Sequence, residues 1–407
     1  MNLPGFFPRP VRTAQETGVP RGLVFDLILK RAFLEGTTSI RRLVNETKLD
    51  YGIVNAVYEE LRKEELCDPK GNYEFALTAK GSRRAEEAYR KSQYAGAVPV
   101  PLTAYCEAVR EQAFRPQVTR ESLADSMADL VVPEEIIRDL GAAIMTGGTI
   151  FLYGPTGNGK TSVAERLHRV FHDLVFIPHA VEVSGQILTV YDPNVHYPVQ
   201  QPADIDFRWV LCQRPFLTVG GEMQSSMLEV RMDELTQVSV APLQMKANNG
   251  ILMIDDFGRQ QMQPRELLNR WIQPLDRRVD YLSLSSGVKF EIPFEVLVVF
   301  ATNLEPSQLA EEAFMRRIKN KIKIGALQAE DLVHIWRRLC EKAGIQLNQE
   351  VAEYACGRCA EYNHGELRAC YPRDLMDIIC GVAGFEQRPP ALTRKQVDRA
   401  IHLYFTR

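Results

Sequence analysis

The sequence has no long hydrophobic run, no leader-like start and no regular cysteine pattern. No apolar run reaches the roughly 18 residues that a membrane helix needs, so insertion into a membrane is not expected. The first ten residues lack a basic stretch followed by an apolar one, which argues against a signal peptide. Eight cysteines spread over 407 residues do not have the spacing of a disulfide scaffold. They predict reduced thiols and a cytoplasmic protein.

An excess of charge of one sign is also absent. The chain has 49 Lys and Arg and 52 Asp and Glu, so its net charge is −3. Composition therefore gives no general attraction to nucleic acid or to acidic membranes. Hydrophobic residues make up 45% of the chain, which excludes a largely disordered protein, and the length fits two or three domains.

The N-terminal quarter has the pattern of a small helical domain. Residues 1–19 hold three prolines and few apolar residues, which predicts an arm. In residues 20–92, three helical patterns precede a hairpin and a charged helix, an order that resembles a winged-helix domain. Residues 93–116, with Pro99 and Pro101, are expected to be a linker.

The rest of the chain divides into an α/β part and a helical part. Residues 117–330 alternate between strand and helix patterns, which predicts a parallel sheet with helices on both faces. Residues 331–407 contain no convincing strand and are expected to form a helical subdomain.

A glycine-rich loop gives the strongest chemical signal. An apolar strand over residues 149–153 precedes it and an amphipathic helix follows it. The loop fits the phosphate-binding pattern G-x-x-x-x-G-K-[ST], and its residues are Gly154, Pro155, Thr156, Gly157, Asn158, Gly159, Lys160 and Thr161, with Ser162 next in the helix. Such a loop turns several backbone N–H groups and a helix N-terminus toward one anion. Lys160 is expected to reach the β- and γ-phosphates, and the Thr161 hydroxyl to bind Mg²⁺.

Two acidic residues follow a second apolar strand. Residues 251–254 lead directly into Asp255 and Asp256, which would lie at the ligand-binding edge of a parallel sheet. Asp255 is expected to hold Mg²⁺ through water, and Asp256 to orient the water that attacks the phosphate.

Further polar residues follow in order. Asn303 comes after a third apolar strand, at residues 296–301, where its amide can orient water or touch a phosphate. Arg316 and Arg317 precede a short strand, where one arginine can neutralise charge on a transferring phosphoryl group. Without other context, paired arginines of this kind are a solvated helix end. Arg373 follows Pro372 at the start of a helix in the helical part.

The ordered set of motifs resembles the AAA+ ATPases over about residues 117–407. The resemblance implies a P-loop NTPase core with a helical lid and a need for ATP and Mg²⁺. Lys160 and Thr161 match Walker A, and Asp255 and Asp256 match Walker B. Asn303 matches sensor 1, Arg373 matches sensor 2, and Arg316 or Arg317 matches the arginine finger. Val131 and Val132 resemble the segment of this family that contacts adenine.

One position departs from the family. A glutamate usually follows the metal-binding aspartate, and here the residue is Asp256, whose carboxylate is one methylene shorter. The shorter Asp256 side chain is compatible with slow hydrolysis of ATP. An arginine finger acts on a neighbouring subunit, so the resemblance implies a homo-oligomer, with a ring of six subunits as the expected form.

The 95 positions between Lys160 and Asp255 exceed what a minimal core needs and predict an insertion at residues 181–247. The segment Ala247-Asn248-Asn249-Gly250, just before the Asp255 strand, resembles the MoxR-type and enhancer-binding branches of the family. Their insertions contact substrate in a pore, and Phe216, Leu217 and Met223 are candidates for that role. Extra packing strands are the alternative.

Two smaller features have two interpretations each. The winged-helix region has 14 Lys and Arg against 12 Asp and Glu, so docking of a protein is favoured over DNA. Cys356, Cys359, His364 and Cys370 approach a zinc-knuckle spacing, but buried packing of the thiols is favoured.

The favoured function is an ATP-driven remodelling or chaperone-like machine that acts on a protein client whose identity the sequence does not give. An ATP-switched transcription regulator that binds DNA through its winged helix is the alternative. A factor that inserts a metal or cofactor into a client enzyme is a third hypothesis.

Overall fold

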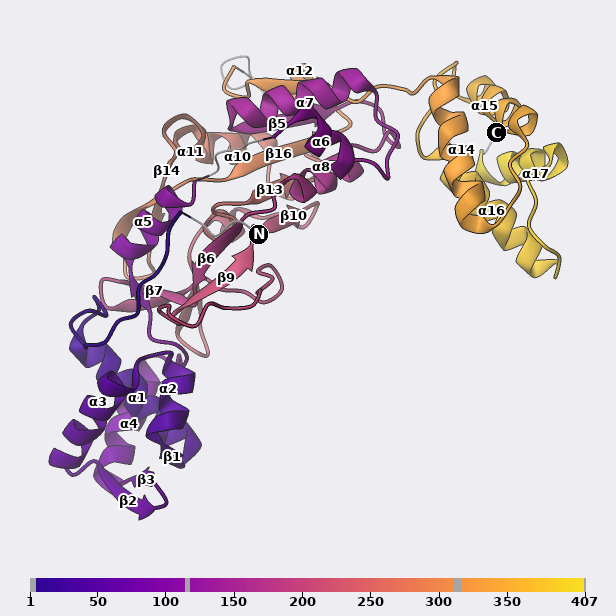
Figure 1. Cartoon of the computed structure of the whole chain (residues 1–407). Coiled ribbons are helices and arrows are strands. Elements are labelled where there is room, and N and C mark those ends of the chain that lie inside the picture. Colours follow the sequence, from indigo (N-terminus) through magenta and orange to yellow (C-terminus); the bar gives the residue numbers. More distant parts are fainter. Residues whose placement is uncertain (1–4, 114–117, 310–315, 406–407) are drawn as a thin grey trace. The chain divides into compact units, whose positions relative to one another are not determined.

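The computed structural model describes residues 5–113, 118–309 and 316–405 (Figure 1). The chain forms two compact units and enters each of them more than once. The first, which we call unit 1, comprises residues 1–115, 172–252 and 266–297; the second, unit 2, comprises residues 116–171, 253–265 and 298–407. Among the described residues, none of the helices has both the length and the apolar character that spanning a bilayer requires.

Unit 1 begins with a helical domain that carries a small antiparallel sheet of order β1-β3-β2. Its elements are α1 (Arg21–Glu35), β1 (Thr37–Ser39), α2 (Ile40–Thr47), α3 (Tyr51–Lys63), β2 (Cys67–Gly71), β3 (Glu74–Leu77) and α4 (Ala79–Lys91). The side chains of Ser39, Asp50 and Thr78 accept hydrogen bonds from backbone N–H groups in the first turns of α2, α3 and α4. The helices and the hairpin follow in the order that the sequence predicts, and the apolar residues of this domain form one buried cluster.

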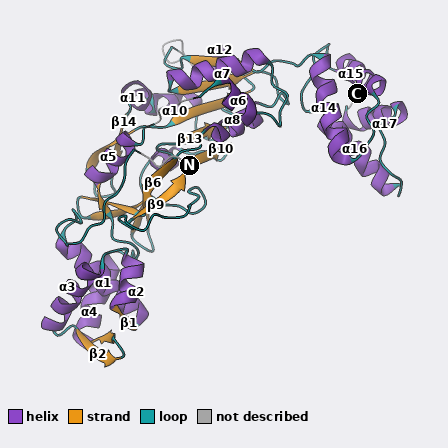
Figure 2. Ribbon diagram, in the orientation of Figure 1, coloured by secondary structure: helices purple, strands orange, loops and turns teal. Residues whose placement is uncertain are grey.

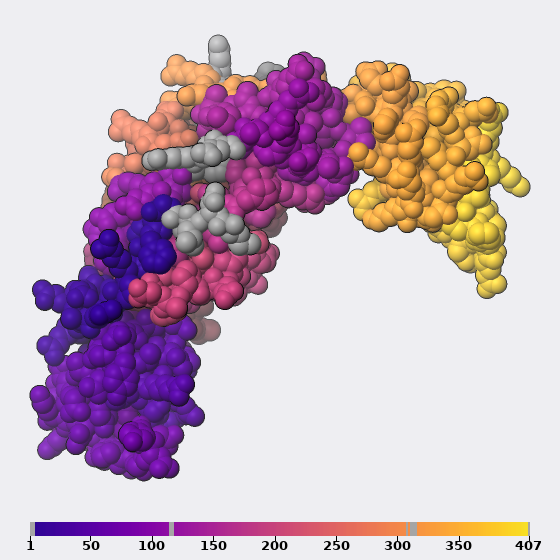
Figure 3. All heavy atoms as spheres, in the orientation of Figure 1, coloured from indigo at the N-terminus to yellow at the C-terminus, as the bar shows by residue number. Residues whose placement is uncertain are grey.

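The described residues before α1 are packed against unit 1. The Phe6 ring lies 5.0 Å from the Trp209 ring, centroid to centroid, and the Asp206 N–H donates to the Pro8 carbonyl at 3.0 Å. Arg208, which is buried and paired with Asp206, donates to the Thr17 carbonyl at 2.8 Å. The predicted arm is thus a segment held by ring contacts and hydrogen bonds at the surface of unit 1, where Figure 3 shows it in dark indigo.

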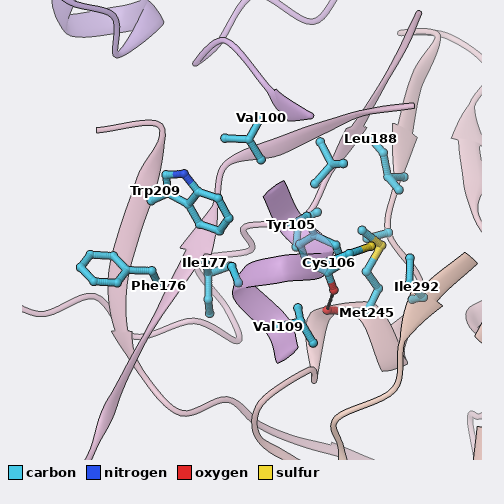
Figure 4. Close-up of a cluster of buried hydrophobic side chains, with 14 of the residues drawn as sticks. Val100, Tyr105, Cys106, Val109, Phe176, Ile177, Leu188, Trp209, Met245 and Ile292 are labelled. Atoms are coloured by element: carbon cyan, nitrogen blue, oxygen red, sulfur yellow. Dashed lines mark hydrogen bonds between the residues drawn. The ribbon is translucent and has the colours of Figure 1, made fainter. Parts of the chain in front are cut away.

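The segment expected to be a linker, residues 93–116, is instead part of the core of unit 1. It contains β4 (Val100–Pro101) and α5 (Leu102–Glu111). Tyr105, Cys106 and Val109 of α5 point into a buried apolar cluster with Met245 and Ile292 (Figure 4). The prolines that suggested a linker lie just before the helix, and the apolar face of α5 pairs with strands far along the sequence.

The predicted insertion at residues 181–247 supplies several strands of unit 1, and segments before and after it supply the others. One sheet has the order β11-β12-β8-β7-β4, and β6 pairs with β9, and β14 with β15, in two antiparallel pairs. The elements are β6 (Leu174–Pro178), β7 (Ala180–Val183), β8 (Gln186–Thr189), β9 (Trp209–Gln213), a 3-10 helix (Ser225–Leu228), β11 (Arg231–Asp233), β12 (Val238–Val240), α9 (Leu243–Lys246), α11 (Ile272–Arg277), β14 (Val279–Ser283) and β15 (Lys289–Pro293).

The parallel sheet that was predicted for the α/β part has the order β10-β13-β16-β5-β17. Strands β16 and β17 run parallel to β5 on its two sides. The elements of this region are α6 (Arg120–Ser126), α7 (Glu134–Thr146), β5 (Thr149–Tyr153), α8 (Lys160–Leu167), a 3-10 helix (His168–Val170), β10 (Phe216–Val219), β13 (Ile251–Ile254), α10 (Pro264–Arg270), β16 (Leu297–Thr302), α12 (Pro306–Leu309) and β17 (Asn320–Lys323).

The central strands of this sheet are buried on both faces. Every residue of β13 and β16 is buried, as are the first four residues of β5. Continuous apolar strands of this kind are typical of parallel sheets covered by helices, and α7 and α8 lie on the two sides of the strands (Figure 2).

The C-terminal region is helical, as predicted, and no described residue after β17 belongs to a strand. It comprises α14 (Ala329–Ala343), α15 (Gln349–Tyr362), α16 (Tyr371–Phe385) and α17 (Arg394–Tyr404). These four helices share one buried apolar cluster, which includes Trp336, Leu375 and Val397. They therefore have a core of their own.

Candidate functional site

The phosphate-type loop joins the end of β5 to the start of α8. Gly154, Gly157 and Gly159 have φ angles of 133°, 82° and 83°, a region that L-residues with side chains rarely adopt. A Cβ at Gly154 would also lie 2.3 Å from the Ile324 carbonyl oxygen. A residue with a side chain at any of these three positions would therefore strain the backbone of the loop.

Lys160 is the first residue of α8, and its side chain turns back over the loop. The Lys160 Nζ donates to the carbonyl oxygens of Gly154 and Pro155, both at 2.9 Å. Burial lowers the pKa of Lys160, while the nearby carboxylates of Asp256 and Asp255 oppose that shift. A half-buried ammonium therefore lies at the loop, close to two carboxylates.

Two motifs that are distant in sequence meet at Thr161 and Asp255. The Thr161 hydroxyl lies 3.1 Å and 3.0 Å from the two carboxylate oxygens of Asp255, which follows β13. A hydroxyl and a carboxylate are both oxygen ligands that Mg²⁺ accepts. This pair therefore fits a Mg²⁺ ion at the sheet edge where the phosphate loop begins.

Asp256 follows with an unusual backbone conformation. Its φ is 48°, its side chain is exposed, and its N–H donates to an Asp255 carboxylate oxygen at 3.0 Å. Aspartate is among the few side-chain-bearing residues that are enriched in the left-handed region. The conformation turns the chain immediately after the strand.

Hydrogen bonds join the ends of β13 and β16 and thereby set the position of Asn303. The Phe257 N–H donates to the Ala301 carbonyl at 2.8 Å, and the Thr302 hydroxyl donates to the Phe257 carbonyl at 2.7 Å. The Asn303 Oδ1 is buried and has no hydrogen-bond partner among the described residues. An unpaired buried acceptor is unusual, and it fits an atom that binds a water or a ligand.

The predicted arginines lie in two other segments, in the turn before β17 and at the start of α16. Arg316 is exposed and Arg317 half-buried in a turn before β17, while the preceding Phe314 and Met315 lie outside the described residues. Arg373 is the third residue of α16 and is exposed. Val131 and Val132 are half-buried in the loop before α7, and Ser162 is half-buried in the first turn of α8.

An arginine that was not predicted does contact the loop. The Arg368 guanidinium donates from Nη1 to the Thr156 hydroxyl at 3.5 Å, and its charge adds to the lowering of the pKa of Lys160. No sequence motif selects Arg368, because it lies within the stretch that resembles a zinc knuckle and precedes the Pro372-Arg373 pair that fits the family motif.

Two other predictions have clear outcomes. Leu217 and Met223 are buried, so they cannot line a pore in this structure, and Phe216 is half-buried.

Among the described residues no group of three or more His, Cys, Asp and Glu could hold a metal ion, and Cys356 and Cys359 are buried in the core of the helical region. The thiols of Cys356 and Cys359 pack among the apolar side chains of that core.

The fold and the site together define a P-loop NTPase core with a C-terminal helical region. Residues 328–403, which form that helical region, match a family described as a domain of unknown function, DUF8689. A search of curated proteins gives no match.

Solved structures resemble the chain only distantly. NtrX from Brucella abortus is 14% identical with a TM-score of 0.39, and the match covers 87% of this chain and 63% of the NtrX chain, which is less than two thirds of it. The RuvB Holliday junction branch migration motor of Thermotoga maritima is 12% identical with a TM-score of 0.36 and coverage of 71% and 72%.

Proposed function

We propose that this chain is an ATPase of the AAA+ type, which binds ATP with Mg²⁺ and hydrolyses it to ADP and phosphate. The observation that carries the proposal is the contact of Thr161 with Asp255, at 3.0 and 3.1 Å, beside the half-buried Lys160 ammonium. The hydroxyl, carboxylate and ammonium come from two motifs 94 positions apart, and each supplies what a metal-bound triphosphate requires.

The loop and its lysine bind the phosphates. The backbone N–H groups of residues 154–161 are the anion donors, and Lys160 exchanges its two carbonyl contacts for phosphate oxygens. Thr161 and Asp255 would hold Mg²⁺, which, when bound, neutralises charge that develops on the phosphate oxygens.

Asp256 and Asn303 act on the attacking water. The Asp256 carboxylate accepts a hydrogen bond from that water and orients it toward the terminal phosphate. The unpaired Asn303 Oδ1 accepts a second one. Two acceptors fix the direction of the water better than one, and the second compensates in part for the shorter side chain of Asp256.

The remaining arginines and the oligomer belong to the same proposal. Arg316 or Arg317 supplies positive charge to the nucleotide of a neighbouring subunit. Arg373 is the sensor 2 arginine of the helical region. The protein then works as a homo-oligomeric ring, with six subunits as the expected number, and remodels a protein client.

Substitution of Lys160 by alanine tests the nucleotide site. Without the ammonium, one or more charge-assisted hydrogen bonds are lost, so we expect the affinity for Mg·ATP to fall about 30-fold or more and hydrolysis to become undetectable. Isothermal titration calorimetry and phosphate release measure the two effects. Lys395→Ala, at an exposed position of α17, is the matched control and should leave both unchanged. Absence of Mg·ATP binding by the folded wild-type protein would refute the proposal.

A DNA-binding regulator remains the second candidate, because residues 20–92 have the element order of a winged helix. The exposed face of α3 argues for a protein partner instead. Its Glu59 lies 3.9 Å from Arg62, and its Glu60 pairs with Arg21 at 2.6 Å, so carboxylates occupy the face that would meet phosphates. A salt-sensitive mobility shift of duplex DNA would favour the second candidate.

A further inference from the structure

A tight turn carries the chain away from β13 at Asp256. The Arg259 N–H donates to the Asp256 carbonyl at 3.0 Å, and Gly258, the third residue of this turn, has a φ of 102°. A positive φ at the third position is typical of a type II turn, where glycine is favoured. A Cβ at Gly258 would also lie 2.7 Å from a methyl carbon of Leu309. The turn therefore requires glycine both for its backbone conformation and for a close side-chain approach.

Gln260, a half-buried residue that no motif selects, closes this turn with its side-chain amide. Its Nε2 donates to the Asp255 carbonyl at 2.8 Å, and its Oε1 accepts a hydrogen bond from the Gly258 N–H, also at 2.8 Å. An amide supplies both a donor and an acceptor, whereas an ionised carboxylate only accepts. One side chain thus binds a peptide group on each side of Asp256.

Phe257 anchors the turn in the core at a point just beyond Asp256. Its N–H donates to the Ala301 carbonyl at 2.8 Å, and its carbonyl accepts from the Thr302 hydroxyl at 2.7 Å. Its ring is buried. These contacts all follow Asp256 in the chain, whereas the Gln260 amide also binds the carbonyl that precedes it.

The Asp256 carboxylate itself is exposed, and no hydrogen bond or ion pair joins it to another residue in the described part of the chain. Its direction therefore depends on the backbone conformation of Asp256, where φ is 48°. The two hydrogen bonds of Gln260 hold that conformation from both sides. A carboxylate that orients a reacting water needs a fixed direction, since a misplacement of about 1 Å can lower a rate about 100-fold.

We propose that Gln260 is a positioning residue for ATP hydrolysis, which acts through Asp256 by fixing the turn that directs its carboxylate toward the attacking water. This inference rests on the proposed ATPase function. Gln260 contacts neither Lys160 nor Thr161, and the Asp255 carboxylate is held by Thr161. Loss of the Gln260 amide should therefore slow the chemical step and leave the binding of Mg·ATP nearly unchanged.

Substitution of Gln260 by methionine tests this role, because methionine has a similar length but forms neither hydrogen bond. Single turnovers with the full chain in excess of ATP measure the chemical step, and calorimetry with the β,γ-imido analogue of ATP measures affinity. We expect the rate to fall about tenfold and the affinity to change less than about twofold. Gln263→Met, at an exposed position three residues further along, is the matched control and should change neither quantity.

A double-mutant cycle separates action through Asp256 from a general structural effect. In an Asp256→Asn background the carboxylate that Gln260 directs is already absent, so adding Gln260→Met should lower the residual rate less than about twofold. Gln260→Asn keeps a polar side chain but is one methylene too short to bind both peptide groups. It should lower the rate at nearly unchanged affinity, even if the Met variant does not fold.

Three results would overturn the inference while leaving wild-type hydrolysis intact. They are an unchanged rate in both Gln260 variants, a loss of rate matched by an equal loss of affinity, and a loss that adds in full to that of Asp256→Asn. Absence of ATP hydrolysis by the folded wild-type protein would instead reject the proposed function itself.

Discussion

Asp256, which stands where the family has glutamate, also has an unusual backbone conformation. Its φ of 48° lies in the left-handed region, where Asp and Asn are enriched among residues that carry side chains. The shorter carboxylate therefore matches the turn that follows β13. It is a local reason for aspartate at a position where the family resemblance leads one to expect glutamate.

Substitution of Asp256 by asparagine should separate binding from hydrolysis. Asparagine tolerates the same φ and keeps the side-chain size, but its amide is a much weaker base and orients water poorly. We expect the rate of hydrolysis to fall about 100-fold or more with nearly unchanged affinity for Mg·ATP. Steady-state phosphate release and calorimetry measure the two quantities. Turnover at the wild-type rate would show that another residue orients the water. Asp256→Glu should not accelerate hydrolysis, because it strains the turn.

Single residues also show where sequence reasoning reaches its limit. Thr161 and Asp255 were predicted because their motifs specify both residue type and spacing, and the structure brings the two side chains into contact. Arg368 belongs to no such motif. Its place at the loop depends on how the segment before α16 packs onto Gly157, and nothing in the local sequence encodes that contact.

Among the elements, those with strong internal patterns were predicted and those defined by distant partners were not. The apolar strands β5, β13 and β16 and the four C-terminal helices match the predicted pattern. Helix α5 was taken as linker because two prolines precede it, although its buried residues Tyr105 and Val109 pack on strands more than 60 residues away. Asn248 and Asn249 were noted only for a family likeness. In the structure their side chains donate to the Tyr105 hydroxyl and the Val109 carbonyl, both at 2.8 Å, and so join α5 to the start of β13.

The start of β13 supplies a prediction at the level of the element. Gly250 precedes the strand, and a Cβ there would lie 2.1 Å from the Pro215 carbonyl, which also accepts the Ile251 N–H at 2.8 Å. Gly250→Ala should therefore shift the strand that leads to Asp255 and lower the free energy of unfolding by about 2 kcal/mol or more.

A matched glycine in a helix gives the control for that substitution. Gly357 lies on the exposed side of α15, and a Cβ there would meet no atom within 4 Å. Gly357→Ala should raise the free energy of unfolding by about 0.5–1 kcal/mol, because alanine favours helix. Urea unfolding followed by circular dichroism measures both variants. Equal effects of the two substitutions would contradict the close approach of Pro215 to β13.

At the level of the whole molecule, the site is assembled from segments that the chain order separates. The phosphate loop, Asp255 and Asn303 lie in three separate stretches of unit 2, and two long segments of unit 1 come between these stretches. Parallel pairing aligns the carboxyl ends of these strands, which is why motifs far apart in sequence predict one site. Strand pairing within one chain does not identify residues that act between copies of the chain, which is the role that we propose for the arginine pair.

Mixing of two inactive variants tests whether an arginine acts on a neighbouring subunit. Arg317→Ala subunits keep an intact loop, and Lys160→Ala subunits keep an intact arginine. In an equal mixture that assembles randomly, roughly a quarter of the interfaces join an intact loop to an intact arginine, so we expect a corresponding part of the wild-type ATPase activity to return. A mixture of Lys160→Ala with Asp256→Asn is the control, because both changes affect one subunit's own site and leave each loop defective in binding or in water orientation. Recovery only when Arg316→Ala replaces Arg317→Ala would assign the role to Arg316. No recovery with either arginine variant, each inactive alone, would mean that the arginine serves its own subunit's nucleotide and that catalysis needs no ring.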